Sequence, residues 1–277
     1  MRFRKFPAGL HVALFSAILT LVACGGGSMG PKQQVAQNPT SPSSPSSGAP
    51  SSGTPAAAST VIDNLDDANA WQTCGACGND HAAGAVANNS FRTGISSPSQ
   101  DGGATQFSIF PTVPYSNTYW FQQHNAISVQ INHLTYEFDL FIPNGAENAP
   151  QAIEFECQQK VGGWIYNFSW QANYSEHVWK IFNYGPAAWE SANVPFQTFA
   201  PGTWHHIVAE YHTDTATHAV FHDALTVDGV RSAVNIRHDA FLANNDGDQF
   251  TNAFQLDTNN RPDTYSVYVD RMKISYN

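Results

Sequence analysis

Two glutamates, Glu154 and Glu156, are the side chains of this sequence best suited to acid–base chemistry. They lie in the alternating segment 153–158, Ile-Glu-Phe-Glu-Cys-Gln, which is typical of a β-strand with one apolar and one polar side. Both carboxyl groups would project from the same side, roughly 6.5–7 Å apart along the strand. Glu210, in another predicted strand, could oppose them. Because glycoside hydrolysis usually needs two carboxyl groups facing one cleft, these three are the candidate catalytic residues.

Other polar side chains alternate in the same way along further predicted strands. If those strands are neighbours, one face of a sheet gathers carboxylates, amides and histidines that can hydrogen-bond a ligand. The candidate ligand-binding residues of this kind are Glu137, Asp139, Gln158, Asn167, Gln171, His206 and His212. An ordinary structural explanation stands beside this one, because antiparallel sandwiches usually have polar outer faces.

Several histidines raise the question of zinc. His206, Glu210 and His212 share one face of a predicted strand, and His218 and His222 lie on the next. Zinc accepts histidine and carboxylate ligands. The spacing matches no recognised zinc motif, so solvent-facing or hydrogen-bonded histidines are the alternative.

The elements that position these side chains are strands, because period-two runs recur and helical periodicity is scarce. Asp228-Gly229 between apolar residues is typical of a tight hairpin turn. About ten strands with short turns predict an all-β, two-sheet antiparallel sandwich. The expected strands are Thr105 to Phe110, Thr118 to Gln122, Leu134 to Ile142, Ala152 to Gln158, Trp164 to Gln171, Val178 to Asn183, Trp204 to His212, His218 to Val227, Ala253 to Asp257 and Tyr265 to Tyr276.

Residues 1–23 have the order of charges and apolar residues of a signal peptide. Three basic residues among the first five precede an apolar run from Leu10 to Val22, which is too short to span a bilayer. The run ends on Leu21-Val22-Ala23-Cys24, which resembles the lipobox of bacterial lipoproteins. There the signal peptide is removed before the cysteine, which is then acylated. We expect lipidation at Cys24 and an extracytoplasmic protein anchored to the cell envelope; ordinary secretion is the alternative.

Residues 24–60 predict a disordered tether. The segment consists mainly of Gly, Ser, Pro, Thr, Ala and Gln, without apolar periodicity. Such a composition cannot bury enough apolar surface to offset the entropy lost on ordering. Gly25 follows the modified cysteine, where lipoproteins retained at the inner membrane commonly have aspartate, and this favours the outer membrane. Flexible chain of this length has a reach of roughly 30–35 Å, which suits a spacer.

Residues 61–277 are expected to form one domain. All 22 acidic residues of the chain lie here against eight basic residues, which gives the segment a formal charge of −14. Nucleic acid is an improbable partner, since phosphate binding needs clustered Lys and Arg. Few charges and seven Trp favour a neutral polysaccharide or oligosaccharide instead. We expect a monomer that contacts the membrane through its lipid anchor alone.

Three cysteines remain after Cys24. Cys74 and Cys77 could close a small disulfide loop in an oxidising compartment. Cys157 is then single, and by alternation it should be buried beside Ile153 and Phe155.

Three segments resemble the concanavalin A-like lectin and glucanase superfamily. Pro201 to Ala209 resembles the Gly-Thr-Trp-His-His-Val-Ala strand of LamG-type domains, and Leu225 to Val230 matches the strand and Asp-Gly turn that usually follow it. Val267 to Ile274 is similar to the final strand of many such sandwiches and of carbohydrate-binding modules. The resemblance implies a jelly-roll sandwich with a concave face that holds an extended saccharide.

The resemblance also implies further site residues. Aromatic rings on which sugar C–H faces lie would come from Trp179, Trp189, Trp120 and Tyr184, with core packing as the alternative for each. A calcium site like those of carbohydrate-binding sandwiches would join Asp63 or Asp66 to Asp270. Structural calcium is the one cofactor suggested.

The superfamily contains binding modules, hydrolases and lyases, so several functions stay open. Non-catalytic polysaccharide binding is the leading prediction. A glycoside hydrolase or polysaccharide lyase acting through paired glutamates is the second, although segment 154–159 lacks the central Asp and the final Glu of the glucanase signature. A structural or adhesive envelope lipoprotein is the third.

Overall fold

The computed structural model describes residues 59–68, 70–73, 86–124, 127, 129–243 and 247–277. Cys24, Cys74 and Cys77, together with the predicted signal peptide and nearly all of the tether, lie outside these residues. The described residues form strands, turns and bends. No helix among them is long and apolar enough to cross a membrane.

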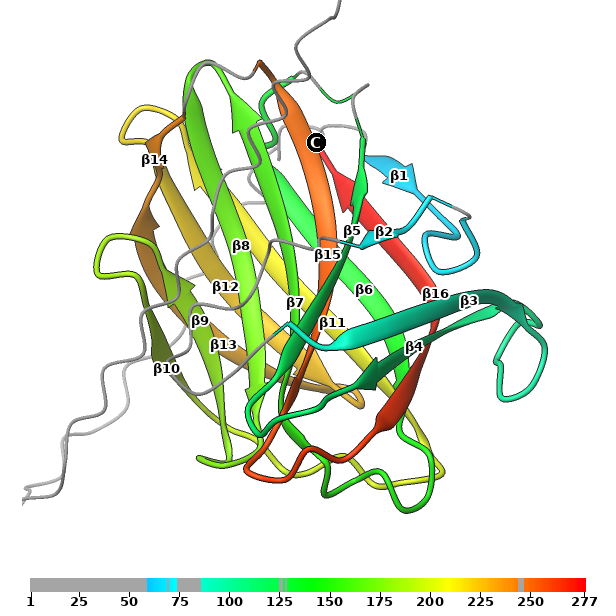
Figure 1. Ribbon diagram of the computed structural model, residues 1–277. Coiled ribbons are helices and arrows are strands. Elements are labelled where there is room, and N and C mark those ends of the chain that lie inside the picture. Colours follow the sequence, from blue (N-terminus) through cyan, green and yellow to red (C-terminus); the bar gives the residue numbers. More distant parts are fainter. Residues whose placement is uncertain (1–58, 69, 74–85, 125–126, 128, 244–246) are drawn as a thin grey trace, which may run out of the picture. The chain divides into compact units, whose positions relative to one another are not determined.

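The strands form two eight-stranded sheets, which we call sheet A and sheet B (Figure 1). In spatial order, sheet A consists of β13 (Val230–Asp239), β12 (Ala219–Val227), β11 (Trp204–Asp214), β6 (His133–Phe141), β16 (Tyr265–Tyr276), β4 (Ala104–Phe110) and β3 (Asn88–Ile95), with β1 (Thr60–Ile62) also paired to β16. Sheet B consists of β10 (Ala188–Pro195), β9 (Val178–Asn183), β8 (Trp164–Asn173), β7 (Pro150–Val161), β15 (Gln249–Thr258), β5 (Asn117–Gln123) and β2 (Gln72–Thr73), with β14 (Phe241–Leu242) also paired to β8.

All pairs between these strands are antiparallel. The predicted all-β, two-sheet antiparallel sandwich is therefore confirmed, and each expected strand has a counterpart. Sequence reasoning missed the short strands β1, β2 and β14 and the longer strands β3, β10 and β13. The three longer ones share a feature. Each is the last or nearly the last strand of its sheet and is rich in polar residues, so its hydrophobic alternation is weak.

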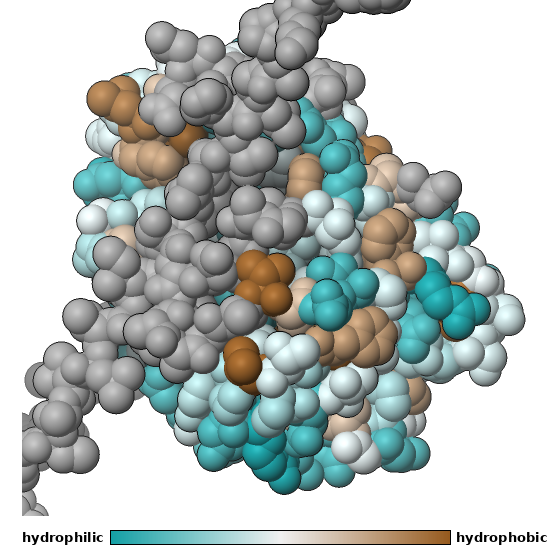
Figure 2. Space-filling view, viewed as in Figure 1, coloured by the Kyte–Doolittle hydropathy of each residue, from teal (hydrophilic) through white to brown (hydrophobic). Residues whose placement is uncertain are grey.

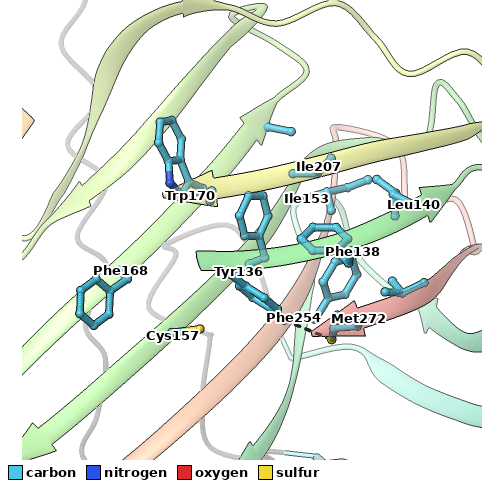
Figure 3. Close-up of a cluster of buried hydrophobic side chains, with 14 of the residues drawn as sticks. Tyr136, Phe138, Leu140, Ile153, Cys157, Phe168, Trp170, Ile207, Phe254 and Met272 are labelled. Carbon is cyan, nitrogen blue, oxygen red and sulfur yellow. Dashed lines mark hydrogen bonds between the residues drawn. The ribbon is translucent and has the colours of Figure 1, made fainter. Parts of the chain in front are cut away.

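Alternate side chains of the central strands fill the space between the sheets (Figure 3). Tyr136 and Phe138 of β6 meet Phe155 of β7 and Phe254 of β15, and the Phe138 and Phe155 rings lie 4.9 Å apart at 75°. This edge-to-face contact adds to the burial of each ring, which is worth about 1.5–3 kcal/mol. Cys157 is a free, fully buried thiol in the same core, as its alternation predicted.

The Asp228-Gly229 turn joins β12 to β13 as predicted, with Val227 paired to Val230. Both turn residues have positive φ, 50° and 80°, which the hairpin geometry requires. The Asp228 carboxylate accepts the backbone N–H of His206 and pairs with Nδ1 of His205, each at 2.8 Å. The turn is therefore tied back onto the neighbouring strand β11.

Candidate functional site

Glu154 and Glu156 lie on the outer face of sheet B. Phe155 between them is buried in the core, so the two carboxylates project away from it on the same side. Strand pairing places Gln171 and Ser169 of β8 directly opposite them on one side. On the other side, Gln255 and Ala253 of β15 stand opposite them. The predicted grouping of these glutamates with amides on one side of sheet B is thus present, although Asn167, Ser169 and Gln171 of β8 are buried there.

The carboxylate of Glu156 is the centre of a hydrogen-bond network on this face. Tyr119 of β5 donates its hydroxyl to Oε1 at 2.5 Å, and Ser169 donates to Oε2 at 2.8 Å. Asn167 Nδ2 lies 3.3 Å from Oε2 and also 3.3 Å from the Tyr184 hydroxyl. Burial, and then the charge of Glu156, raise the pKa of Tyr119 well above 10, so its phenol remains a donor. Glu156 therefore fixes side chains from two other strands, β5 and β8.

Glu154 belongs to a second chain of hydrogen bonds on the same face. Gln171 donates Nε2 to its Oε1 at 2.6 Å, and Asn173 donates to the oxygen of Gln171 at 2.8 Å. Asp257 of β15, which accepts from Gln255 at 2.9 Å, adds a further carboxylate. Burial, and then the charge of Asp257, raise the pKa of Glu154 well above 4.5. Glu154 therefore keeps its proton to a higher pH than a free glutamate does.

Aromatic side chains lie on both sides of the polar side chains that β7, β8 and β15 contribute to this face. Tyr119 and Phe121 of β5 form one border, with ring centroids 6.3 Å apart. The small Ala253 on β15 leaves room for Tyr119 to reach across to Glu156 on β7. The hydrogen-bonded side chains around Glu156 therefore lie directly beside the aromatic rings of β5.

The other border comes from β9, β10 and β14. Phe182 contacts Tyr184 at 4.8 Å and Trp189 at 5.3 Å, while Tyr184 stacks on Phe241 at 4.4 Å and 22°. We call the whole surface the polar-aromatic face; its members are Tyr119, Phe121, Glu154, Glu156, Asn167, Ser169, Gln171, Asn173, Phe182, Tyr184, Trp189, Phe241, Gln255 and Asp257. Seen from the side of Figure 1, the described surface is mostly teal and white, with brown residues scattered among them (Figure 2).

The expectation that Glu210 opposes Glu154 or Glu156 is wrong. Glu210 lies on β11, in sheet A, with Ala209 and Tyr211 on either side of it buried in the core. Its carboxylate therefore faces outward from the opposite side of the sandwich, beyond two sheets that pack about 10 Å apart. There it accepts two hydrogen bonds from Arg231, each at 2.8 Å, which lower its pKa. The strand pattern could not decide which strands share a sheet.

Four other predicted ligand-binding residues also lie on sheet A, not beside the glutamates of sheet B. Glu137, Asp139, His206 and His212 project from the outer face of β6 and β11. Each of them has a side-chain partner: Nδ1 of His206 lies 2.8 Å from Asp139, Nδ1 of His212 lies 2.7 Å from Asp223, and Lys273 lies 3.0 Å from Glu137. Asp139 is also bound by Arg271. The single predicted face is therefore two faces, and only Gln158, Asn167 and Gln171 accompany Glu154 and Glu156.

Two of the expected aromatic platforms lie in the core. Trp179 is 2% exposed and packs on Phe196, and Trp120 is fully buried against Phe107. Trp189 and Tyr184 do lie on the polar-aromatic face. Sequence reasoning missed Tyr119, Phe121, Phe182, Phe241 and Asp257 there. In Tyr-Trp-Phe at 119–121 both sides of the strand are aromatic, so alternation alone does not reveal which side faces the core.

The aspartates expected to bind calcium are held by protein groups. Asp66 accepts the backbone N–H of Met272 at 2.8 Å, and burial raises its pKa to about 7. Asp270 accepts from Ser99 at 2.9 Å, whereas Asp63 is exposed. Among the described residues, no group of three or more His, Cys, Asp or Glu is arranged to hold a metal ion. Calcium binding stays a prediction.

Comparisons with known proteins give structural likenesses at low identity. No family model and no curated protein matches the sequence. Peanut lectin is similar over 80% of this chain and 98% of its own, with 11% identity and a TM-score of 0.44. A carbohydrate esterase from Shiga toxin-encoding bacteriophage phi24B is similar over 75% of this chain and 90% of its own, with 12% identity and a TM-score of 0.44.

A structure of carbohydrate-binding modules from the β-sandwich superfamily is similar over 75% of this chain, with 12% identity and a TM-score of 0.40. The chain spans 58% of that structure's length. Likeness at this level assigns no ligand, because one fold hosts many functions.

Proposed function

We propose that this chain is a carbohydrate-binding protein held outside the cytoplasm by a lipid on Cys24, with the polar-aromatic face of sheet B as its binding surface. The observation that carries the proposal is the arrangement of that face. Rows of carboxylate and amide side chains on β7, β8 and β15 lie between an aromatic border on β5 and another on β9, β10 and β14.

This arrangement suits a saccharide for two physical reasons. Sugar hydroxyls need both donors and acceptors, and the half-buried amide of Gln255 supplies both beside the carboxylate acceptors. The amides of Asn167, Gln171 and Asn173 are buried and hold the carboxylates of Glu154 and Glu156 in place. The C–H faces of a pyranose lie well against aromatic rings, which Tyr119 and Trp189 offer on opposite borders. The existing hydrogen bonds hold these side chains in place, so less conformational entropy is lost when a ligand binds.

The charge of the face favours an uncharged polysaccharide. Glu156 and Asp257 lie in its centre, bonded mainly to neutral donors. Glu154 beside them has a raised pKa and adds less negative charge. The nearest cations on the same strands are Lys160, four residues beyond Glu156, and Lys180, which is paired with Glu176. Like charges repel at short range, so uronic acids and sulfated sugars are disfavoured.

A glycan array with the purified protein tests the proposal. We expect binding to neutral polysaccharides and weak or no binding to polyanionic ones. Binding to no glycan would contradict carbohydrate recognition and favour a structural or adhesive envelope protein. A strong preference for polyanionic glycans would contradict the assignment of this acidic face as the binding surface.

A glycoside hydrolase acting through Glu154 and Glu156 is the second candidate. One observation favours it: the two carboxyl groups share a face, and the raised pKa of Glu154 suits a general acid. Against it, Glu156 already accepts three hydrogen bonds. A reducing-sugar assay on each polysaccharide bound in the array separates the two functions. Release of new reducing ends by wild type, lost in Glu154→Gln, would establish hydrolysis.

A further inference from the structure

Two histidines on the outer face of sheet A, His133 and His212, stand directly opposite each other on β6 and β11. The carbonyl of Asn132 accepts the N–H of Thr213, and the carbonyl of His133 accepts the N–H of Asn277 on the other side of β6. His133 and His212 therefore form a non-hydrogen-bonded cross-strand pair, the kind in which side chains come closest.

The distance between the two rings suits a shared metal ion. Their centroids are 5.9 Å apart. Zinc–nitrogen bonds of 2.0–2.1 Å at a tetrahedral angle would place two imidazole centroids about 5 Å apart. A small side-chain rotation at this exposed position closes that difference.

The environment of His212 resembles that of a metal ligand. Nδ1 of His212 lies 2.7 Å from the Asp223 carboxylate, and its ring stacks on Phe221 at 4.3 Å and 5°. A hydrogen bond from Nδ1–H to a carboxylate fixes the tautomer that leaves Nε2 with a free lone pair. Within the described part of the chain, Nε2 of His212 and both ring nitrogens of His133 have no hydrogen-bond partner.

A third histidine on the same face shows the contrast. His206 also lies on β11 and faces outward, but Nδ1 is 2.8 Å from Asp139 and Nε2 is 3.5 Å from Glu137. Both of its nitrogens are engaged by carboxylates. His206 therefore serves as a control: it lies on the same strand and face as His212 but has no ring nitrogen free to bind a metal ion.

From these contacts we propose that His133 and His212 bind one divalent transition-metal ion, with Asp223 as the positioning residue and water in the remaining coordination positions. Imidazole nitrogen favours zinc, copper and nickel over calcium and magnesium. The site lies on the opposite sheet from the polar-aromatic face and does not depend on saccharide binding.

Calorimetric titration of the metal-free, tag-free protein with Zn²⁺ tests this proposal. We expect saturable binding of one ion per chain by wild type and by the control His206→Gln. We expect its loss in His133→Gln and His212→Gln, and about 10–100-fold weaker binding in Asp223→Asn. Far-UV circular dichroism checks that each variant is folded. Because His133 is exposed, His133→Gln should disturb the fold less than His212→Gln or Asp223→Asn.

Two outcomes would overturn the proposal. One is the absence of saturable Zn²⁺ binding to wild type. The other is binding that His133→Gln and His212→Gln leave unchanged, because the ion would then be held elsewhere. As a second readout, Zn²⁺ should raise the Tm of wild type and His206→Gln and leave that of folded His133→Gln unmoved.

Discussion

At the scale of single residues, Glu154 and Glu156 have different environments although they are only two positions apart on β7. Glu156 accepts hydrogen bonds from Tyr119, Asn167 and Ser169, all of them neutral donors. Glu154 has one neutral donor and lies beside the carboxylate of Asp257. The first environment holds the Glu156 side chain in place, and the second favours a proton on Glu154.

A pH-dependent stability follows for Glu154. Its pKa is raised in the folded protein, so the stability that it contributes is fully present below the unfolded pKa and is lost as pH rises through the folded one. Glu154→Gln keeps the acceptor for Gln171 and offers Asp257 an N–H donor. We expect this variant to have a higher Tm than wild type at pH 8 and a similar Tm at pH 4, measured by thermal unfolding across pH. An equal difference at both pH values would contradict the raised pKa.

At the scale of elements, the β12–β13 hairpin depends on one side chain. Asp228 occupies a turn position with positive φ and accepts two hydrogen bonds from the start of β11. Asp228→Ala loses both bonds and places a poorly suited residue at positive φ. We expect the free energy of unfolding in urea to fall by about 1–3 kcal/mol. Asp228→Asn, which tolerates the same φ and can keep one acceptor, should lose less; equal losses would contradict the role of the carboxylate.

The strands themselves show how far the sequence predicts the site. Alternation correctly placed Glu154, Glu156, Asn167 and Gln171 on the side of sheet B away from the core, because each stands between buried apolar neighbours. It did not show that Asn167 and Gln171 are themselves buried. It could not show that β11 belongs to the other sheet, since sheet membership depends on pairings between segments distant in sequence. This is why Glu210 was grouped wrongly with them.

At the scale of the whole molecule, the two outer faces of the sandwich differ in the partners of their acidic side chains. On sheet A, Glu137, Asp139 and Glu210 are paired with Lys273, Arg271 and Arg231. On sheet B, the central acids are bonded mainly to amides and hydroxyls, which are also the groups that sugars engage. The sheet B face is therefore the one suited to hydroxylated ligands.

The predicted anchor is also tested on the whole protein. Expressed with its own leader in a bacterium that processes lipoproteins, the wild-type chain should incorporate radiolabelled palmitate and sediment with membranes. Cys24→Ser should lose the label and be recovered in the soluble fraction, because no acyl chain can be attached. Label retained in Cys24→Ser would show that the lipid is elsewhere.

The most direct measurement is calorimetric titration of one neutral oligosaccharide, chosen from the glycan array, into variants matched between the two faces. Tyr119→Ala and Trp189→Ala each remove one aromatic border of sheet B, while Trp204→Ala removes a half-buried tryptophan that packs on Phe141 at the outer face of sheet A. We predict several-fold weaker binding for the first two, about 1 kcal/mol each, and wild-type affinity for the third. Loss of affinity in Trp204→Ala, with Tyr119→Ala and Trp189→Ala unaffected, would contradict the proposed binding surface.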